Sequence, residues 1–370
     1  MNREAVERQR RALAAAGLDA LIAISPENVV YTTDIAVPSQ PLMRWRHAVA
    51  IVTGDGRNAM LVIDMEETTV RSDPEIHNVR VYREFVEDPI EKLADLLIEL
   101  GLARGAVGVE LDYLPAKGFL TLQRRLPDAK IVAADAIFSK LRQVKGRKEI
   151  ELLRELSRIT DQAIGETLKG ARAGMTEMDL AGELLGRLFA GGAENYKLMI
   201  VASGERSQYP NVGPTERALK SGDLIRMEIF GQKHGYLAGI CRTAIVDRAT
   251  PEQEKIWNNL VECKYLVMDM IKPGASCKEV YRKFLERFSA LGFEPISFVG
   301  HGIGLALHEE PYLGRYGDEI LEEGMVVAIE PLVYIPGRFG MQNKDMLVVT
   351  KTGCELLSNQ TNTDELIRTQ

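Results

Sequence analysis

Cysteine is scarce in this 370-residue sequence, and long apolar runs are missing from it. The four cysteines, at positions 241, 263, 277 and 354, form no CxxC pair and no spacing typical of a metal site. A disulfide framework is therefore not expected, which indicates a reducing compartment, and we expect a cytoplasmic location. No stretch approaches the ~18 apolar residues that a membrane helix requires, so no membrane partner is expected.

An excess of basic charge is also absent. The chain has 46 Lys and Arg against 53 Asp and Glu, which gives a net charge of -7. This balance does not provide the positive surface that nucleic acids require, so no nucleic-acid partner is expected. It is compatible with a cationic or zwitterionic small-molecule substrate. The length predicts two domains.

Helix and strand patterns alternate over residues 1–140, which predicts an α/β domain. The charged segment 142–148 is the best boundary, so we place the domains at 1–141 and 142–370. Beyond it, long helices at about 148–169 and 177–190 are followed by strands, two more helices and glycine- and proline-punctuated strands. A set of helices with largely antiparallel strands predicts an α+β domain.

Two glutamates interrupt apolar strands of the second half. Glu228 lies in Leu-Ile-Arg-Met-Glu-Ile-Phe, and Glu330 lies in Met-Val-Val-Ala-Ile-Glu-Pro. A carboxylate in a buried strand is unfavourable unless it is paired or bound to something. A structural ion pair would explain either one alone. Two of them in one domain with a His-Gly-Ile-Gly turn at His301 predict a functional site.

Four segments carry a resemblance to a known family. They are SGDLIRMEIFGQKHGYLAGICRT (221–243), FVGHGIGLALHEEP (298–311), EEGMVVAIEPLVYIP (322–336) and MQNKDMLVVT (341–350). In this order they resemble the catalytic domain of the pita-bread family, which includes methionine aminopeptidase, aminopeptidase P, prolidase and creatinase. The first half resembles the creatinase/prolidase N-terminal domain. The resemblance implies an α+β pita-bread C-terminal domain preceded by a smaller α/β creatinase-like domain.

The family's metal ligands match this chain poorly. Its metallopeptidases bind two divalent ions through two aspartates, a histidine and two glutamates, and these positions fall on Glu228, Gly239, His301, Glu330 and Lys344. Gly239 offers no ligand atom, and a charged lysine repels a dication. Two carboxylates and a lysine do not neutralise four positive charges, so we predict a site with no metal. If any cofactor binds, the resemblance implies a single divalent ion at Glu228, His301 and Glu330.

Creatinase, a metal-free member of the family, hydrolyses the amidine C–N bond of creatine. The chain resembles it in MIKPGASCKEV (270–280) and in the basic residue at 344. It departs from creatinase at two positions. A histidine of the loop before SGD is replaced by Asn211, and the glutamate of creatinase's Glu-Arg-Thr is replaced by Cys241. Creatine itself is therefore not predicted as the substrate.

Several residues are candidates for catalysis. Glu228 or Glu330, shielded from water, would have a raised pKa and act as general acid and base. His301 is another proton carrier, because neutral imidazole needs little retuning at pH 7. Lys344 is a candidate for pairing with a glutamate or stabilising an oxyanion. Cys241 is either a nucleophile of lowered pKa or a small buried residue that fills space beside a glycine.

His308 follows His301 by seven residues, and its counterpart in the peptidases hydrogen-bonds the substrate carbonyl or the intermediate. A surface histidine next to two glutamates is the alternative interpretation. Asn211, in the loop before SGD, and Arg242, within the first motif segment, are also taken as substrate-binding candidates.

Three further arginines are candidates for binding a substrate carboxylate. Arg44 and Arg46 resemble the position from which creatinase's N-terminal domain serves the active site of the neighbouring subunit. The resemblance thus implies a homodimer. An ordinary loop with a half-buried tryptophan is the alternative. Arg315 lies near another family carboxylate contact, behind a short insertion.

Three functions remain open. The first is a metal-independent hydrolase of a C–N bond in a small carboxylate-bearing substrate, whether amide, amidine or cyclic amidine. The second is an Xaa-Pro metallopeptidase of the aminopeptidase P or prolidase type with a reduced metal site. The third is a catalytically inactive, peptidase-shaped binding protein.

Overall fold

The computed structural model describes residues 1–369, which divide into two compact units, the second of which begins at residue 143. The domain boundary predicted from the sequence, between residues 141 and 142, lies one residue before this division. No helix within the described residues is long and apolar enough to cross a bilayer.

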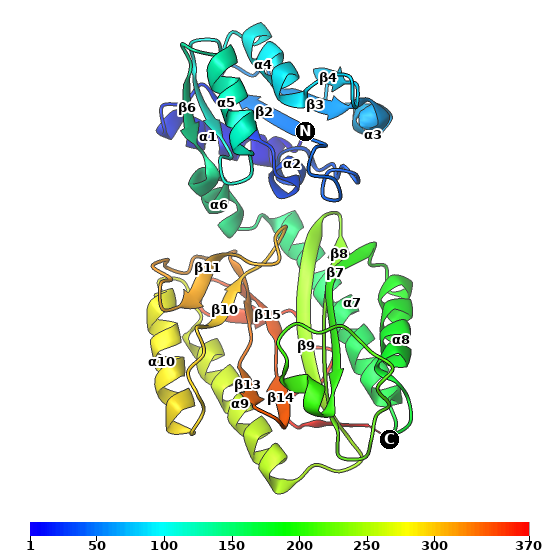
Figure 1. The fold of residues 1–370 in the computed structure, drawn as a ribbon. Coiled ribbons are helices and arrows are strands. Elements are labelled where there is room, and N and C mark those ends of the chain that lie inside the picture. Colours follow the sequence, from blue (N-terminus) through cyan, green and yellow to red (C-terminus); the bar gives the residue numbers. More distant parts are fainter. Residues whose placement is uncertain (370) are drawn as a thin grey trace. The chain divides into compact units, whose positions relative to one another are not determined.

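The first unit is a mixed six-stranded sheet with helices packed on it (Figure 1). The strands lie in the order β4 (Val79–Tyr82), β3 (Ala59–Ile63), β2 (Val49–Thr53), β1 (Ala20–Ala23), β5 (Ala106–Val109) and β6 (Lys130–Ala133). β1 pairs in parallel with β5 and antiparallel with β2. Every residue of β1, β2 and β3 is buried, which explains their near-continuous apolar sequences.

Six α-helices and a short 3-10 helix complete the first unit. They are α1 (Arg3–Ala15), α2 (Pro26–Thr33), η1 (Asp64–Glu66), α3 (Glu67–Arg71), α4 (Pro89–Glu99), α5 (Ala116–Arg125) and α6 (Asp135–Gln143), the last of which ends at the boundary. Two of the longer ones begin at a capped N-terminus. The side chain of Asn2 accepts from the backbone N–H of Ala5, and that of Asp88 accepts from the N–H groups of Ile90 and Glu91.

The second unit has helices on the outside and strands between them (Figure 1). A four-stranded sheet has the order β17 (Ile367–Thr369), β9 (Tyr236–Val246), β8 (Leu224–Lys233) and β7 (Asn195–Ser203). A five-stranded sheet has the order β11 (Glu309–Gly314), β10 (Phe298–Gly302), β12 (Val326–Ile329), β15 (Asp345–Val349) and β16 (Cys354–Leu356). A third, two-stranded sheet pairs β13 (Leu332–Ile335) with β14 (Phe339–Gln342).

Helices cover the two larger sheets. α7 (Arg147–Gly170) packs on β8 and β9 and contacts α8 (Glu177–Ala190). The side chains of α9 (Pro251–Met270) and α10 (Cys277–Ala290) share one apolar core with β12 and β15. The short helix η2 (Gly204–Gln208) begins the loop between β7 and β8.

The β8–β9 hairpin positions most of the site. Its antiparallel register pairs Glu228 with Cys241 and Phe230 with Gly239. Directly opposite residues of an antiparallel pair point to the same face, so these four positions share one side of the sheet. The hairpin turns at His234, whose side chain is exposed and pairs with Glu194.

Candidate active site

A buried lysine joins the two strand glutamates. Lys344 Nζ lies 3.1 Å from Glu228 Oε1 and 3.2 Å from Glu330 Oε2, and its side chain is 1% exposed. Burial alone would lower the pKa of Lys344, but the two carboxylates outweigh this effect and raise it. Lys344 therefore places a permanent positive charge between the two acids.

The expectation of a raised pKa is wrong for Glu330. Burial disfavours the charged form of this carboxyl, but Lys344 and His301 favour it more strongly and hold its pKa well below the ordinary value. Sequence reasoning anticipated the burial and not the strength of the pairing.

The two histidines of the glycine-turn segment stack on each other. The rings of His301 and His308 lie 3.6 Å apart at 11°, and His301 is fully buried. Desolvation of the His308 ring, together with the neighbouring His301 and the Lys344 ammonium, lowers the pKa of His308 to about 4, so His308 is neutral at pH 7. The structure therefore makes His308 more than an isolated surface histidine.

The His301 ring also faces Glu330. Its Nδ1 lies 2.8 Å from the carbonyl oxygen of Gly302, which can only accept, so this nitrogen carries a proton. Its Nε2 then faces Glu330 Oε1 at 3.3 Å. In a neutral imidazole both atoms would be acceptors, so a proton or another cation between them is needed to satisfy both.

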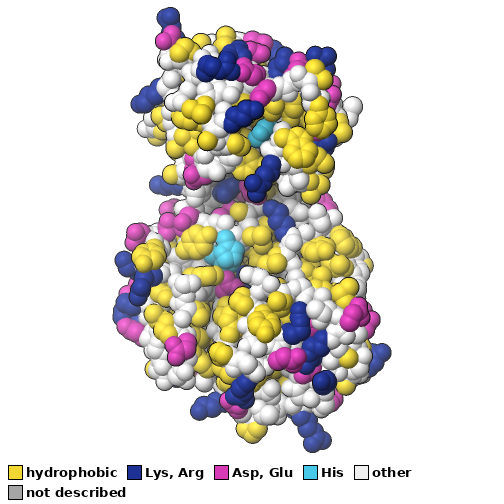
Figure 2. Space-filling model, in the orientation of Figure 1, with side chains coloured by type: hydrophobic (Ala, Val, Ile, Leu, Met, Phe, Trp, Pro, Cys, Tyr) yellow, Lys and Arg dark blue, Asp and Glu magenta, His cyan; other side chains and the backbone are white. Residues whose placement is uncertain are grey.

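Glu228, His308, Glu330 and Lys344 border a cavity of about 570 Å³ in the second unit, whereas His301 lies behind Glu330 and is not one of the lining residues. On the face shown in Figure 2, a histidine side chain reaches the surface of this unit among apolar side chains. The residues that line the cavity come from β7, β8, β10, β13 and β14 and the connecting loops: Leu198, Pro210, Asn211, Arg226, Glu228, Phe230, Ile296, Ser297, Phe298, Leu307, His308, Glu330, Leu332, Tyr334, Gln342 and Lys344. A volume of this size suits a small molecule.

Comparison with known proteins identifies the family. Residues 151–351 match metallopeptidase family M24, and residues 6–144 match the creatinase/prolidase N-terminal domain. The chain belongs to metallopeptidase family M24. The predicted fold class is confirmed, because this family match agrees with a TM-score of 0.86 to the Xaa-Pro dipeptidase from Bacillus anthracis, at 26% identity over 99% of both chains.

Sequence relatives of this M24 chain extend over most of its length. It is 28% identical to the uncharacterized peptidase YqhT of Bacillus subtilis over 94% of this chain and 96% of that protein. It is also 28% identical to the Xaa-Pro dipeptidase of Pyrococcus furiosus, over 80% of this chain and 86% of that protein. The family is one of hydrolases that cleave C–N bonds.

The M24 metal pair does not fit the residues of this chain. A side chain at Gly239 has no room, because its Cβ would lie 2.3 Å from Cε1 of Phe230. The Phe230 ring thus fills the place of the missing ligand, and Lys344 Nζ lies 4.5 Å from the ring centroid. An ammonium and an aromatic ring stand where the two-ion chemistry requires carboxylates.

A single ion is also poorly accommodated. The single-ion site predicted from the sequence consists of Glu228, His301 and Glu330. Lys344 already lies between the two carboxylates of this site. Ligand atoms of His301, His308 and Glu330 do lie within 4.8 Å of one another. The two rings are nearly parallel, however, so the in-plane nitrogen lone pairs do not converge on one point about 2 Å away, as a tetrahedral zinc site requires.

Cys241 lacks the low pKa of a nucleophile. Its side chain is fully buried, and burial raises its pKa well above the ordinary value. It does not line the cavity. Its backbone instead bridges that of Lys344, with N–O distances of 3.3 and 3.1 Å. The structure therefore favours a packing role for this residue.

Two predicted substrate-binding arginines lie outside the cavity. Arg242 is fully buried between Asp161 and Asp345, at 2.9 and 2.8 Å, and it donates to the carbonyl oxygen of Lys344 at 2.8 Å. Arg242 therefore supports the backbone at Lys344 and does not border the cavity where a substrate would bind. Arg315 is exposed just after β11 and does not border the cavity. Asn211 does line it.

The arginines of the first unit differ in their surroundings. Arg46 pairs with Glu84 through two hydrogen bonds of 2.8 Å, and Trp45 Nε1 donates to the same carboxylate at 3.1 Å. This pairing occupies the guanidinium of Arg46, which was expected to bind the substrate carboxylate. Arg44 is exposed. Of the two, Arg44 has the charge more readily available for a ligand.

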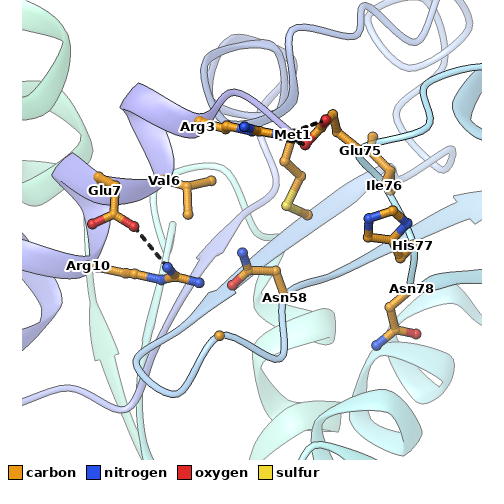
Figure 3. Close-up of a pocket in the computed structure, with 11 residues that line it drawn as sticks. Met1, Arg3, Val6, Glu7, Arg10, Asn58, Glu75, Ile76, His77 and Asn78 are labelled. Carbon is orange, nitrogen blue, oxygen red and sulfur yellow. Dashed lines mark hydrogen bonds and ion pairs between the residues drawn. The ribbon is translucent and has the colours of Figure 1, made fainter.

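A second cavity, in the first unit, has charged walls that are already paired (Figure 3). Arg3 binds Glu75 through both carboxylate oxygens, and Arg10 pairs with Glu7 at 2.9 Å. We therefore place the candidate site in the second unit.

Four residues of the site were not among the predicted catalytic or binding residues: Arg226, Phe230, Tyr334 and Gln342. Each borders the cavity. A strand-internal arginine in Leu-Ile-Arg-Met-Glu is the one signal that could have pointed to this group, because a buried guanidinium needs partners as much as a buried carboxylate does.

Proposed function

We propose that the chain is a metal-independent hydrolase of a C–N bond in a small, carboxylate-bearing amide, amidine or cyclic amidine. The observation that carries this proposal is the Lys344 ammonium, 3.1 and 3.2 Å from Glu228 and Glu330 at the wall of a 570 Å³ cavity. This cation supplies fixed positive charge inside the family's catalytic domain.

Each residue of the site has its own role in the proposed hydrolysis. Water adds to the carbon of the C–N bond and gives one proton to the Glu330–His301 pair, and the negative charge that develops on the carbon's other substituent is stabilised by the Lys344 ammonium. Glu330 and His301 share the proton position at 3.3 Å, from which a proton reaches the leaving nitrogen as the C–N bond breaks. His308 faces the cavity and hydrogen-bonds the reacting group. Glu228 holds Lys344 in place.

The substrate carboxylate belongs near Arg44 in this proposal. The exposed side chain of Arg44 is a suitable cation, whereas Arg46 is held by Glu84. We propose a homodimer in which one subunit's first unit serves the other's cavity, as the creatinase-like N-terminal domain suggests.

An Xaa-Pro metallopeptidase is the second candidate, and the names of relatives such as the Pyrococcus furiosus Xaa-Pro dipeptidase favour it. The two functions are separated by screening purified protein against ureido, guanidino, cyclic-amidine and Xaa-Pro compounds, with and without a chelator. Our proposal requires turnover that a chelator does not reduce. Turnover of an Xaa-Pro dipeptide that depends on added Mn²⁺, Co²⁺ or Zn²⁺ would establish the metallopeptidase instead. No turnover in any arm would favour a binding protein.

A further inference from the structure

The guanidinium of Arg226 is buried without a carboxylate partner. The residue lies on β8, two positions before Glu228, and is fully buried. Within residues 1–369 no ion pair involves it. Its donors go to neutral oxygens: Nε to the carbonyl of Ser207 at 3.1 Å, and Nη2 to the carbonyls of Tyr209 and of Pro210, the latter at 3.0 Å. Arg226 thus donates hydrogen bonds to three backbone carbonyls of the loop that carries Asn211.

The same guanidinium reaches the active-site acid through one amide. Arg226 Nη1 donates to Gln342 Oε1 at 2.9 Å, and Gln342 Nε2 donates to Glu330 Oε2 at 2.9 Å. Arginine can only donate, so it fixes the oxygen of Gln342 toward itself and the NH₂ group toward Glu330. The Gln342 backbone is held in turn, because its N–H donates to Thr243 Oγ1 at 3.0 Å and its carbonyl accepts from that hydroxyl at 2.9 Å.

We propose that Arg226 and Gln342 are positioning residues that tie the 207–211 loop to Glu330. The loop is held along the cavity wall, and Glu330 is held through Oε2 so that Oε1 stays directed at His301. This inference rests on the proposed function in one respect, because the bridge matters for catalysis only if Glu330 carries the proton. The physical coupling of loop and carboxylate stands on the contacts alone.

Hydrogen–deuterium exchange of the full chain tests the bridge without a substrate. Arg226→Met should accelerate exchange over residues 204–213 by on the order of tenfold or more, because it removes charge-assisted hydrogen bonds that hold the loop. Gln342→Met, whose side chain donates to Glu330 and not to the loop, should accelerate the same segment by a smaller factor. Gln253→Met is the matched control, because Gln253 caps α9 and should leave this segment unchanged.

Unchanged exchange of 204–213 in Gln342→Met, beside faster exchange in Arg226→Met, would overturn the bridge. If Arg226→Met fails to fold, Arg226→Lys keeps the charge and loses the fork, and it should accelerate the same segment. Where a substrate has been found, Gln342→Met should lower kcat about tenfold and change KM little. A wild-type protein without turnover would refute the proposed function, and the exchange data would still decide the bridge.

Discussion

At the residue scale, the site is organised around one cation. By the resemblance of their motifs, Lys344 and Gly239 stand at positions of ligand carboxylates in the M24 metallopeptidases, and the Phe230 ring fills the space beside the glycine. These three residues form a mutually fitted set: the ring needs the glycine, and the ammonium lies over the ring. Restoring one metal ligand alone would disturb the other two.

Removing the ammonium should destabilise the fold strongly. Lys344→Met leaves Glu228 and Glu330 buried without their shared partner, and breaking a buried pair in this way costs about 3–5 kcal/mol. Urea denaturation monitored by circular dichroism measures the loss. Lys351→Met, at an exposed position, is the control and should change stability by less than about 0.5 kcal/mol. A Lys344→Met protein as stable as wild type would show that the two acids do not depend on this charge.

The packing of Phe230 on Gly239 predicts a rescue. Gly239→Ala should cost about 1–3 kcal/mol, because its Cβ would lie within 3 Å of three ring atoms. Adding Phe230→Leu should recover part of that loss, which a double-mutant cycle in urea detects. Gly213→Ala meets nothing within 4 Å and serves as the control. Additive effects of the two changes would contradict the account.

At the scale of elements, the sequence predicted the long helices well and the short ones poorly. α7 was expected at about 148–169 and is Arg147–Gly170. α2 was not predicted, because its eight residues are rich in β-branched types and too few to show a helical period. α6 was not predicted either, and its last turn overlaps the charged segment expected to be the boundary.

The site itself was predictable only in part. Period-two alternation predicts that Glu228 and Phe230 share one face of their strand and that Gly239 and Cys241 share one face of theirs, and the β8–β9 register brings these faces to the same side of the sheet. The bridge from Arg226 through Gln342 and the stacking of the two histidines were not accessible. They depend on how β14 packs against β8 and on how the loop after β10 folds back, which no local pattern encodes.

The segment between β10 and β11, which carries His308, ends at a buried ion pair on the first residue of β11. Lys145 Nζ lies 2.6 Å from Glu309 Oε1, with side-chain exposures of 1% and 4%. Lys145→Met should therefore cost about 3–5 kcal/mol. Arg338→Met, which breaks the exposed pair with Glu252, should cost under about 1 kcal/mol in the same denaturation experiment. Equal losses for the two variants would show that the buried pair contributes no more to stability than the exposed one.

At the scale of the whole molecule, the proposed homodimer predicts complementation. Arg44→Met should impair substrate binding, and Lys344→Met should inactivate the catalytic unit. If one subunit's Arg44 serves the other's cavity, mixing and re-associating the two variants should restore part of the wild-type turnover, because mixed dimers contain one intact site. Each variant re-associated with itself is the control. Mixtures no more active than the separate variants would place Arg44 and Lys344 in the same subunit's site, or Arg44 outside it.

The central claim is that Lys344 supplies the positive charge that metal ions supply in the M24 metallopeptidases. The most direct test is the metal content of purified, catalytically active protein, measured by inductively coupled plasma mass spectrometry before and after incubation with Zn²⁺, Mn²⁺ or Co²⁺ and removal of unbound ions. The account predicts substoichiometric metal in every sample and turnover that does not change with metal content. One or two tightly bound ions per chain, with turnover that follows their number, would contradict it.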